Sequence, residues 1–305
     1  MCTAVVSLQP AARMPLLLLG FRDEFTGRPW RPPARHWPGS PLIGGRDEEA
    51  GGTWLALHPD VPRVSCLLNG RGQQAEAARR RSRGELPLHA AGSGPEALKE
   101  LRDDLATLAC YDPFILLSAD LTSAQLLSWD GTRAVLADLG PGTHVITNSG
   151  HTYPPAADGT AQDDTAQGVA AHHGIVQEDH STPEDTVPPR SVPAPAGEAR
   201  PGHNTPPPDT KGQHFGPRFG ARRPAADPAA SMAEAWGDWL TLARGDGLPG
   251  DDSSAIIARR DLPDGRLWGT TSVSLIALGS SRLRYDFQPV PADPASWYSV
   301  DIGRP

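Results

Sequence analysis

The amino end reads MCTAVVSL over residues 1–8 and, after a short connector, LLLLGFRDEF over residues 16–25. Both stretches are rich in residues that favour β-strands, and the connector carries a proline near each of its ends. We therefore predict a hairpin with strands over residues 2–8 and 16–21. Because no helix separates these strands, the sheet that contains them begins as an antiparallel sheet.

The pairing of Leu8 with Leu16 sets the register of this hairpin and places Cys2 opposite Arg22, to within about two positions. The open end of the hairpin then gathers Cys2, Arg22, Asp23 and Glu24. Neighbouring strand residues face opposite ways, so Arg22 and Asp23 both point at Cys2 only where a strand bulges or bends. The alternative for residues 22–24 is a solvated charged turn.

The rest of the chain contains many short β-like runs and two helical patterns. One helix is predicted from Pro95, which lies in a capping-box sequence, through Leu108, with leucines on one face. The second is predicted over residues 232–243. Further strands are expected over residues 53–58, 64–69, 114–118, 125–129, 132–139, 144–147, 255–259, 267–278 and 282–288. This pattern predicts an α+β fold with antiparallel sheets and segregated helices.

Residues 155–228 form a polar stretch that prolines interrupt repeatedly and that has few large apolar side chains. We predict a disordered insertion there, within a single domain, and the other 230 or so residues suffice for one core. Five of the ten histidines lie in this stretch, but no carboxylate or cysteine spacing accompanies them, so we expect no metal site. An interaction segment is the alternative to a simple spacer.

The 305-residue chain has a formal net charge of −8, and its only basic run is the short stretch of residues 79–83. This balance argues against a nucleic-acid partner. The three cysteines, Cys2, Cys66 and Cys110, show neither a disulfide framework nor a zinc spacing, which favours a reducing cytoplasm. The apolar run over residues 16–19 is too short for a signal or a membrane span. We expect a small-molecule ligand or substrate; the sequence identifies no protein partner.

Cys2 carries the sharpest chemical signal in the sequence. Removal of Met1 would leave a thiol and a free α-amine on one residue, with ordinary pKa values of about 8.5 and about 7.7–8.0. The amine would then serve as the base that activates the thiol. A nearby arginine lowers a thiol pKa, and a carboxylate can hold the amine in place. The alternative is that Cys2 is a small apolar residue at the start of the first strand.

Several short motifs occur together in one order. They are Met1-Cys2-Thr3, Phe21-Arg22-Asp23-Glu24-Phe25 with Arg28-Pro29, Gly51-Gly52-Thr53-Trp54-Leu55, His144-Val145-Ile146-Thr147-Asn148 and Gly269-Thr270-Thr271-Ser272. In this order the chain resembles the NRDE family, which includes the eukaryotic transport and Golgi organisation proteins. The resemblance covers residues 1–150 and 230–290. It implies an N-terminal-nucleophile hydrolase-like fold, a four-layer αββα sandwich of two antiparallel sheets.

A more distant similarity to the bile-salt hydrolase and penicillin V acylase group implies roles for individual residues. By this resemblance Cys2 is the nucleophile, Arg22 and Asp23 flank it, and Asn69 and Asn148 are oxyanion donors. Each asparagine is otherwise an ordinary turn former. The chain departs from the family with Phe21 where the NRDE pattern has Asn, and with Thr271 where relatives tend to carry Arg.

Two functions follow as expectations. The first is hydrolysis of a non-peptide amide C–N bond without a cofactor, with Cys2 as nucleophile and with Glu24, Trp54 and Thr271 contacting the substrate. The second is a non-enzymatic binding or trafficking protein whose ligand is haem or an acyl lipid. The two departures from the family pattern leave open whether the chain is an enzyme, because a fold can persist after its chemistry is lost.

Overall fold

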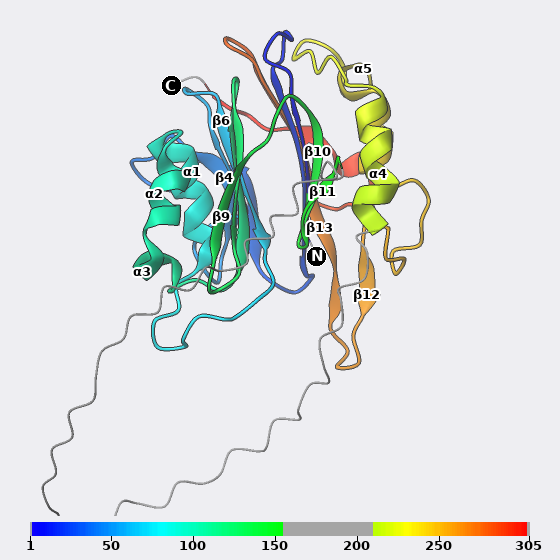
Figure 1. Cartoon of the computed structure of the whole chain (residues 1–305). Helices are drawn as coiled ribbons and strands as arrows, with labels where there is room; N and C mark the ends of the chain where they lie inside the picture. Colours follow the sequence, from blue (N-terminus) through cyan, green and yellow to red (C-terminus); the bar gives the residue numbers. More distant parts are fainter. Residues whose placement is uncertain (1, 155–209, 304–305) are drawn as a thin grey trace, which may run out of the picture. The chain divides into compact units, whose positions relative to one another are not determined.

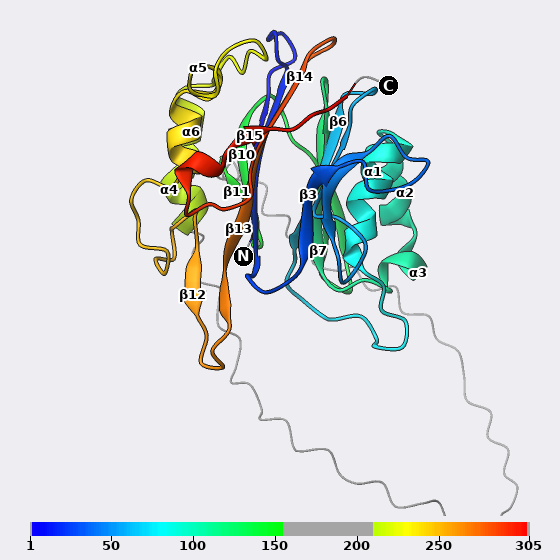
Figure 2. The same cartoon turned by 180° about the vertical axis from the view of Figure 1, so that it is seen from behind.

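The computed structural model describes residues 2–154 and 210–303. These residues form two antiparallel β-sheets that lie face to face, with a layer of helices on the outer side of each sheet (Figures 1 and 2). The predicted α+β sandwich is therefore confirmed. Within these ranges, no helix has both the length and the apolar character that a membrane crossing requires.

The amino-terminal hairpin lies at the centre of the first sheet. β1 pairs with β2 so that Leu8 lies opposite Leu16 and Thr3 opposite Phe21, which confirms the predicted register. β13 pairs with the other edge of β2 along its full length. The strands follow the spatial order β11 (Gly150–Tyr153), β10 (Gly142–Thr147), β1 (Thr3–Leu8), β2 (Leu16–Phe25), β13 (Leu267–Leu278), β14 (Leu283–Gln288) and β15 (Tyr298–Ser299), and β12 (Arg259–Asp261) also pairs with β13.

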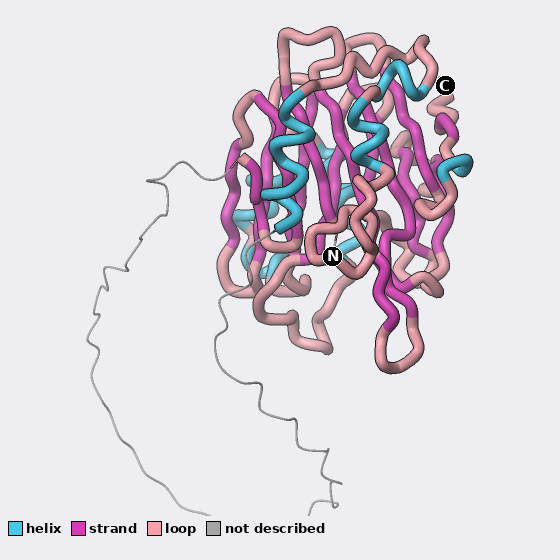
Figure 3. The backbone as a smooth tube through the Cα atoms, turned by 90° about the vertical axis from the view of Figure 1, so that its right-hand side faces the viewer, coloured by secondary structure: helices cyan, strands magenta, loops and turns pink. Residues whose placement is uncertain are grey.

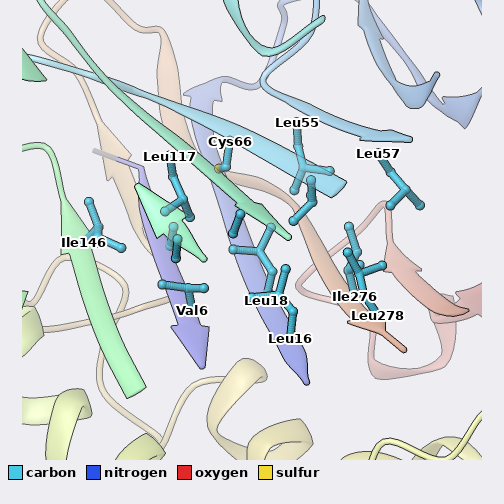
Figure 4. Close-up of a cluster of buried hydrophobic side chains, with 14 of the residues drawn as sticks. Val6, Leu16, Leu18, Leu55, Leu57, Cys66, Leu117, Ile146, Ile276 and Leu278 are labelled. Carbon is cyan, nitrogen blue, oxygen red and sulfur yellow. The ribbon is translucent and has the colours of Figure 1, made fainter. Parts of the chain in front are cut away.

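The second sheet is a meander in which each strand pairs with the next one along the chain. Its strands are β3 (Trp30–Ala34), β4 (Ile43–Asp47), β5 (Leu55–His58), β6 (Arg63–Asn69), β7 (Phe114–Asp120), β8 (Ala124–Trp129) and β9 (Ala134–Asp138). The inner faces of the two sheets meet in a buried apolar core, to which Val6 and Leu18 contribute from the first sheet and Leu57 and Leu117 from the second (Figure 4).

The helices differ from the sequence prediction in where they begin and end. The helix predicted from Pro95 to Leu108 is divided into α2 (Ala97–Asp103) and α3 (Leu105–Leu108), because Asp104 leaves the helical region and caps α3 through the N–H of Thr107. The predicted helix over residues 232–243 is divided into α5 (Met232–Trp236) and α6 (Asp238–Ala243) at Gly237, whose φ is 48°. η1 (Arg83–Glu85) and α1 (Leu86–Ser93) precede α2, and η2 (Pro294–Ser296) follows β14.

The prediction of a disordered insertion over residues 155–228 was wrong for its last part. Residues 155–209 lie outside the described residues, but α4 (Thr210–Ala221) is a helix that lies over the first sheet beside α6 (Figures 1 and 3). Phe215 and Phe219 of α4 are fully buried against that sheet. Two phenylalanines one helical turn apart therefore anchor a segment whose overall composition is polar. The strand predicted over residues 255–259 was also misplaced, because β12 begins at Arg259.

Candidate functional site

Cys2 lies at the open end of the central hairpin, as the register predicted. It is half-buried, and its Sγ lies 3.8 Å from the main-chain oxygen of Asp23. Its side chain packs against the core between the sheets, which also contains Cys66. Burial raises the pKa of the Cys2 thiol, and the charge of Asp23 raises it further, against the charge of Arg22. The thiol is therefore protonated near neutral pH and needs a base to become a nucleophile.

A β-bulge shapes the strands beside Cys2. Asp23 pairs with Thr270 and Arg22 pairs with Ser272, so Thr271 is an extra residue on β13. Arg22 reaches toward the second sheet, whereas the carboxylate of Asp23 lies beside Lys211 of α4. The main-chain oxygen of Asp23 thus lies beside the sulfur of Cys2.

The side chain of Arg22 is buried, with 4% of its surface exposed, and its guanidinium makes three contacts. Its Nη1 donates to Thr271 Oγ1 at 2.9 Å, its Nη2 donates to Asp47 Oδ2 at 3.3 Å, and its guanidinium carbon lies 4.5 Å from the centroid of the Trp54 ring. Burial lowers the pKa of Arg22, and the carboxylates of Glu24 and Asp47 oppose this shift. These contacts fix the direction of the guanidinium.

Asp23 is also fully enclosed. Its Oδ1 accepts a hydrogen bond from Thr270 Oγ1 at 2.7 Å, and its Oδ2 lies 3.7 Å from Lys211 Nζ. The sequence analysis missed Lys211 because it assigned this residue to the insertion. Two signals in the sequence marked it nonetheless: it is one of only two lysines in the chain, and Phe215 follows it one helical turn later.

A cavity of about 400 Å³ opens beside Cys2. Among the residues predicted for the site, those that line it are Cys2, Arg22, Asp23, Glu24, Trp54 and Asn69. Thr271 lines a neighbouring cavity of about 300 Å³, on the other side of Arg22. The structure therefore brings six of the predicted residues to one space and places Thr271 behind one of them.

The two predicted oxyanion donors lie in different places. Asn69 ends β6, opposite Phe114, and borders the cavity that contains Cys2. Asn148 follows β10 and borders a separate cavity together with Arg71. The Oδ1 atom of Asn148 is buried, and none of the described residues donates a hydrogen bond to it. The structure therefore brings Asn69, but not Asn148, to the cavity of Cys2.

Asp47 and Arg28 also line this cavity, and the sequence analysis gave neither a role. Arg28 donates to both carboxylate oxygens of Asp47, at 2.6 and 2.9 Å, and its Nε lies 3.9 Å from Glu24. Burial disfavours the charged form of Asp47, but the hydrogen bonds from Arg28 and from the Ala50 N–H hold its pKa below its ordinary value. Glu24, Arg28, Asp47 and Arg22 thus form one chain of alternating charges along the cavity wall.

Trp54 lines the same cavity beside this chain of charges. Its ring packs edge-on against Trp30, with the centroids 5.8 Å apart. It also lies so close to β4 that a Cβ at Gly45 would come within 2.2 Å of the ring. Glycine at position 45 therefore leaves the space that the Trp54 ring occupies against β4, where the ring contacts the Arg22 guanidinium.

The basic run over residues 79–83, which the sequence analysis considered only as a nucleic-acid signal, lies at the cavity mouth. Arg80 pairs with Asp112 at 3.1 Å, Arg81 pairs with Glu85 at 2.9 Å, and Arg83 donates to the Pro113 carbonyl at 2.7 Å. Burial lowers the pKa of Arg83. Each of these three arginines thus has its own partner, and the cavity mouth carries charges of both signs.

The residues that the structure describes include no group of three or more His, Cys, Asp or Glu side chains placed to hold a metal ion. Of the five histidines that the sequence analysis assigned to the insertion, His214 lies on α4 beside Asp246. The other four, His172, His173, His180 and His203, lie outside the described residues. Cys2 is the residue of the cavity that offers a soft ligand atom for a haem iron.

Comparisons with known proteins found one family. Residues 1–185 match a family model described as Transport and Golgi organisation 2. Among solved structures, the chain is similar to the N-acylethanolamine-hydrolyzing acid amidase ortholog of Caenorhabditis elegans. The two share 14% identity over 48% of this chain and 70% of that one, with a TM-score of 0.28. No curated protein matches the sequence.

Proposed function

The chain belongs to the Transport and Golgi organisation 2 family, and from that premise we propose that it is a hydrolase of the N-terminal-nucleophile type that cleaves a non-peptide amide C–N bond. One observation carries the proposal: the thiol of Cys2, the fixed guanidinium of Arg22 and the side chain of Asn69 border one cavity. A nucleophile, a fixed cation and an amide donor around one space are the parts that acyl transfer requires.

The proposed reaction has two steps. The sulfur of Cys2 attacks the amide carbon, and its proton passes to the α-amine that the loss of Met1 leaves on the same residue. That proton moves to the leaving nitrogen as the C–N bond breaks, which releases an amine and leaves a thioester. Water then attacks the thioester carbon, one proton of the water passes through the α-amine to the sulfur as the C–S bond breaks, and the carboxylic acid is released.

The surrounding residues take separate parts in this scheme. Arg22 orients the acyl group, and Asp23 holds the amino end of Cys2 in place. Asn69 donates to the oxyanion from the wall of the same cavity. Asn148 is a second donor only for a substrate that reaches its neighbouring cavity. Glu24 and Trp54 contact the substrate from the lining, and Thr271 acts on it through Arg22.

The size of the cavity points to a small molecule. About 400 Å³ lies within the range of small-molecule sites, and the lining carries charges of both signs. Neither a nucleic acid nor a membrane lipid surface is required by this arrangement, and we place the reaction in the cytoplasm because the three cysteines are free.

The test uses the full chain and a panel of N-acyl 4-nitroanilides that differ in acyl length and charge. Turnover of one of them, with an acyl adduct on Cys2 in the intact mass, is the expected result. Cys2→Ala should abolish both signals, whereas Cys110→Ala, at another half-buried thiol, should retain them. Full turnover by protein that still carries Met1 would overturn the proposal, because its α-amine would not belong to Cys2.

A second candidate function is non-enzymatic binding of haem or an acyl lipid. The observation that favours it is the raised pKa of the Cys2 thiol, since a protonated thiol is a poor nucleophile. Titration with haem should then give a Soret band that Cys2→Ala shifts, and a fluorescent fatty-acyl probe should bind and be displaced by unlabelled lipid. If neither ligand produces a saturable signal, this candidate is eliminated.

A further inference from the structure

Lys211 is buried at the start of a helix, where a lysine side chain is normally exposed to solvent. It lies in the first turn of α4, and it is only 4% exposed. Lysine is rarely buried unless it is paired, and a cation near a helix N-terminus opposes the helix dipole. Its Nζ lies 3.7 Å from Asp23 Oδ2, whose carboxylate is itself inaccessible to solvent. The charge of Asp23 therefore offsets both the burial of the ammonium and its unfavourable place near the helix N-terminus.

The packing of α4 sets the depth at which Lys211 enters the sheet. A Cβ at Gly212 would lie 2.2 Å from Thr152 Oγ1, and a Cβ at Gly216 would lie 2.2 Å from Tyr153 Cγ. Both contacted residues belong to the end of β11. Because glycine has no side chain, α4 lies closer to the first sheet than it could with larger residues at positions 212 and 216. This short distance lets the Lys211 side chain reach Asp23 on β2.

Lys211 lies next to one of the charges that act on Cys2. The groups whose charges shift the pKa of the thiol are Asp23 and Arg22 on β2 and the amino terminus, and the thiol in turn acts on Cys66 of β6 and Arg83 of η1. Among them, the Asp23 carboxylate disfavours the thiolate, and Lys211 is the cation beside that carboxylate. A cation there offsets the negative charge that the thiolate meets.

We propose that Lys211 is a positioning residue of the Cys2 site, which acts through the carboxylate of Asp23. Its catalytic meaning rests on the proposed function: the ammonium holds the Asp23 carboxylate in place, and its positive charge opposes a second positive charge on the α-amine of Cys2, so that the amine stays available as a base. Its effect on the thiol does not depend on that function. α4, the first element after residue 209, thereby joins the site.

The experiment measures the rate at which iodoacetamide alkylates Cys2 in the full chain between pH 5.5 and 9.5, with the modified residue located by peptide mass spectrometry. Lys211→Met should raise the apparent pKa of the thiol and slow alkylation at pH 7.5 by about threefold, equivalent to about half a pKa unit. Lys211→Arg should recover most of this loss. Lys99→Met is the matched control, because Lys99 is 60% exposed and pairs with Glu96 at 3.6 Å on the surface.

The Asp23→Asn background separates a role through Asp23 from a structural one. There the double variant Asp23→Asn/Lys211→Met should alkylate like Asp23→Asn alone, because the carboxylate that Lys211 offsets is gone. The double variant removes both buried charges, so it remains measurable if Lys211→Met alone does not fold. Asp23→Asn alone leaves the Lys211 ammonium without this carboxylate, so its circular dichroism must match that of the wild type before the two are compared. An unchanged or lowered thiol pKa in Lys211→Met, or an equal slowing in both backgrounds, overturns the proposal. The intact mass shows separately whether Met1 is retained. Retention of Met1 would rule out the proposed hydrolase mechanism, but the effect of Lys211 on the thiol could still be measured.

Discussion

The guanidinium of Arg22 donates a hydrogen bond to the hydroxyl of Thr271, 2.9 Å away, and the same hydroxyl donates back to the main-chain oxygen of Arg22 at 3.1 Å. The bulge on β13 makes this exchange possible, because it gives Thr271 no partner of its own on β2. Thr271 therefore fixes the arginine that borders Cys2. A larger or charged side chain at position 271 would have to displace one of these two bonds.

Thr271→Val should destabilise the protein by about 1–3 kcal/mol, because the variant leaves a buried guanidinium N–H without its acceptor. Urea unfolding measures the change in the free energy of unfolding. Thr241→Val, at an exposed position of α6, is the control and should change it little. If both variants lose the same stability, the bond between Arg22 and Thr271 is not what holds the arginine.

The carboxylate of Asp47 should make stability depend on pH in the acid range. Because its pKa is lowered in the folded protein, it contributes stability that is present above its unfolded pKa of about 4 and that is lost as the pH falls through the lower folded value. Asp47→Asn should therefore be less stable than the wild type at pH 7, and the difference should shrink below pH 4.

The measurement for Asp47 is urea unfolding of both proteins at intervals from pH 3 to pH 7. Asp138→Asn serves as the control, because Asp138 is exposed at the edge of the second sheet, where Gln125 is its partner. A difference between wild type and Asp47→Asn that stays constant with pH would contradict the assigned role of Asp47.

The thiol of Cys2 should titrate above an ordinary cysteine. Burial and the charge of Asp23 raise its pKa, so the neutral thiol is favoured by folding, and the stability it contributes is lost as the pH rises through the folded pKa. The alkylation rate of the folded protein should therefore reach half of its plateau value above pH 8.5, whereas the rate of the urea-unfolded chain should reach half of its plateau value at about pH 8.5. The position of the plateau, unlike the absolute rate, does not depend on access of the reagent. A plateau below pH 8 contradicts this assignment.

The parts of the site that the sequence predicted are those that lie close together along the chain. Leu8 and Leu16 flank a short connector, so their pairing fixed where Cys2 and Arg22 meet. Asn69 ends a strand whose apolar pattern was clear, and it reached the predicted cavity. In these cases local pattern and tertiary structure agree.

The parts that the sequence did not predict depend on contacts between distant segments. Lys211 meets Asp23 because α4 packs on the first sheet, and the polar composition around residue 211 outweighed the one local signal of that packing, Phe215. Arg28, in the turn between β2 and β3, meets Asp47 at the end of β4, and in the sequence each residue alone reads as an exposed charge. Asn148, which was predicted from a motif, lies beside a different cavity, since a motif fixes the strand and not the direction of the next side chain.

A substitution at Gly216 tests whether the close packing of α4 against β11 affects the Cys2 site. A Cβ at this position would lie 2.2 Å from the Tyr153 ring, so Gly216→Ala must push the helix away from β11, at a cost of about 1–3 kcal/mol. Gly92→Ala is the matched control, since Gly92 is also helical and a Cβ there would meet only Leu42 at 3.8 Å; it should be neutral or stabilising by up to about 1 kcal/mol. Because the shifted helix carries Lys211, Gly216→Ala should also slow Cys2 alkylation at pH 7.5, whereas Gly92→Ala should not. Loss of stability with an unchanged alkylation profile would show that the depth of α4 and the state of the thiol are independent.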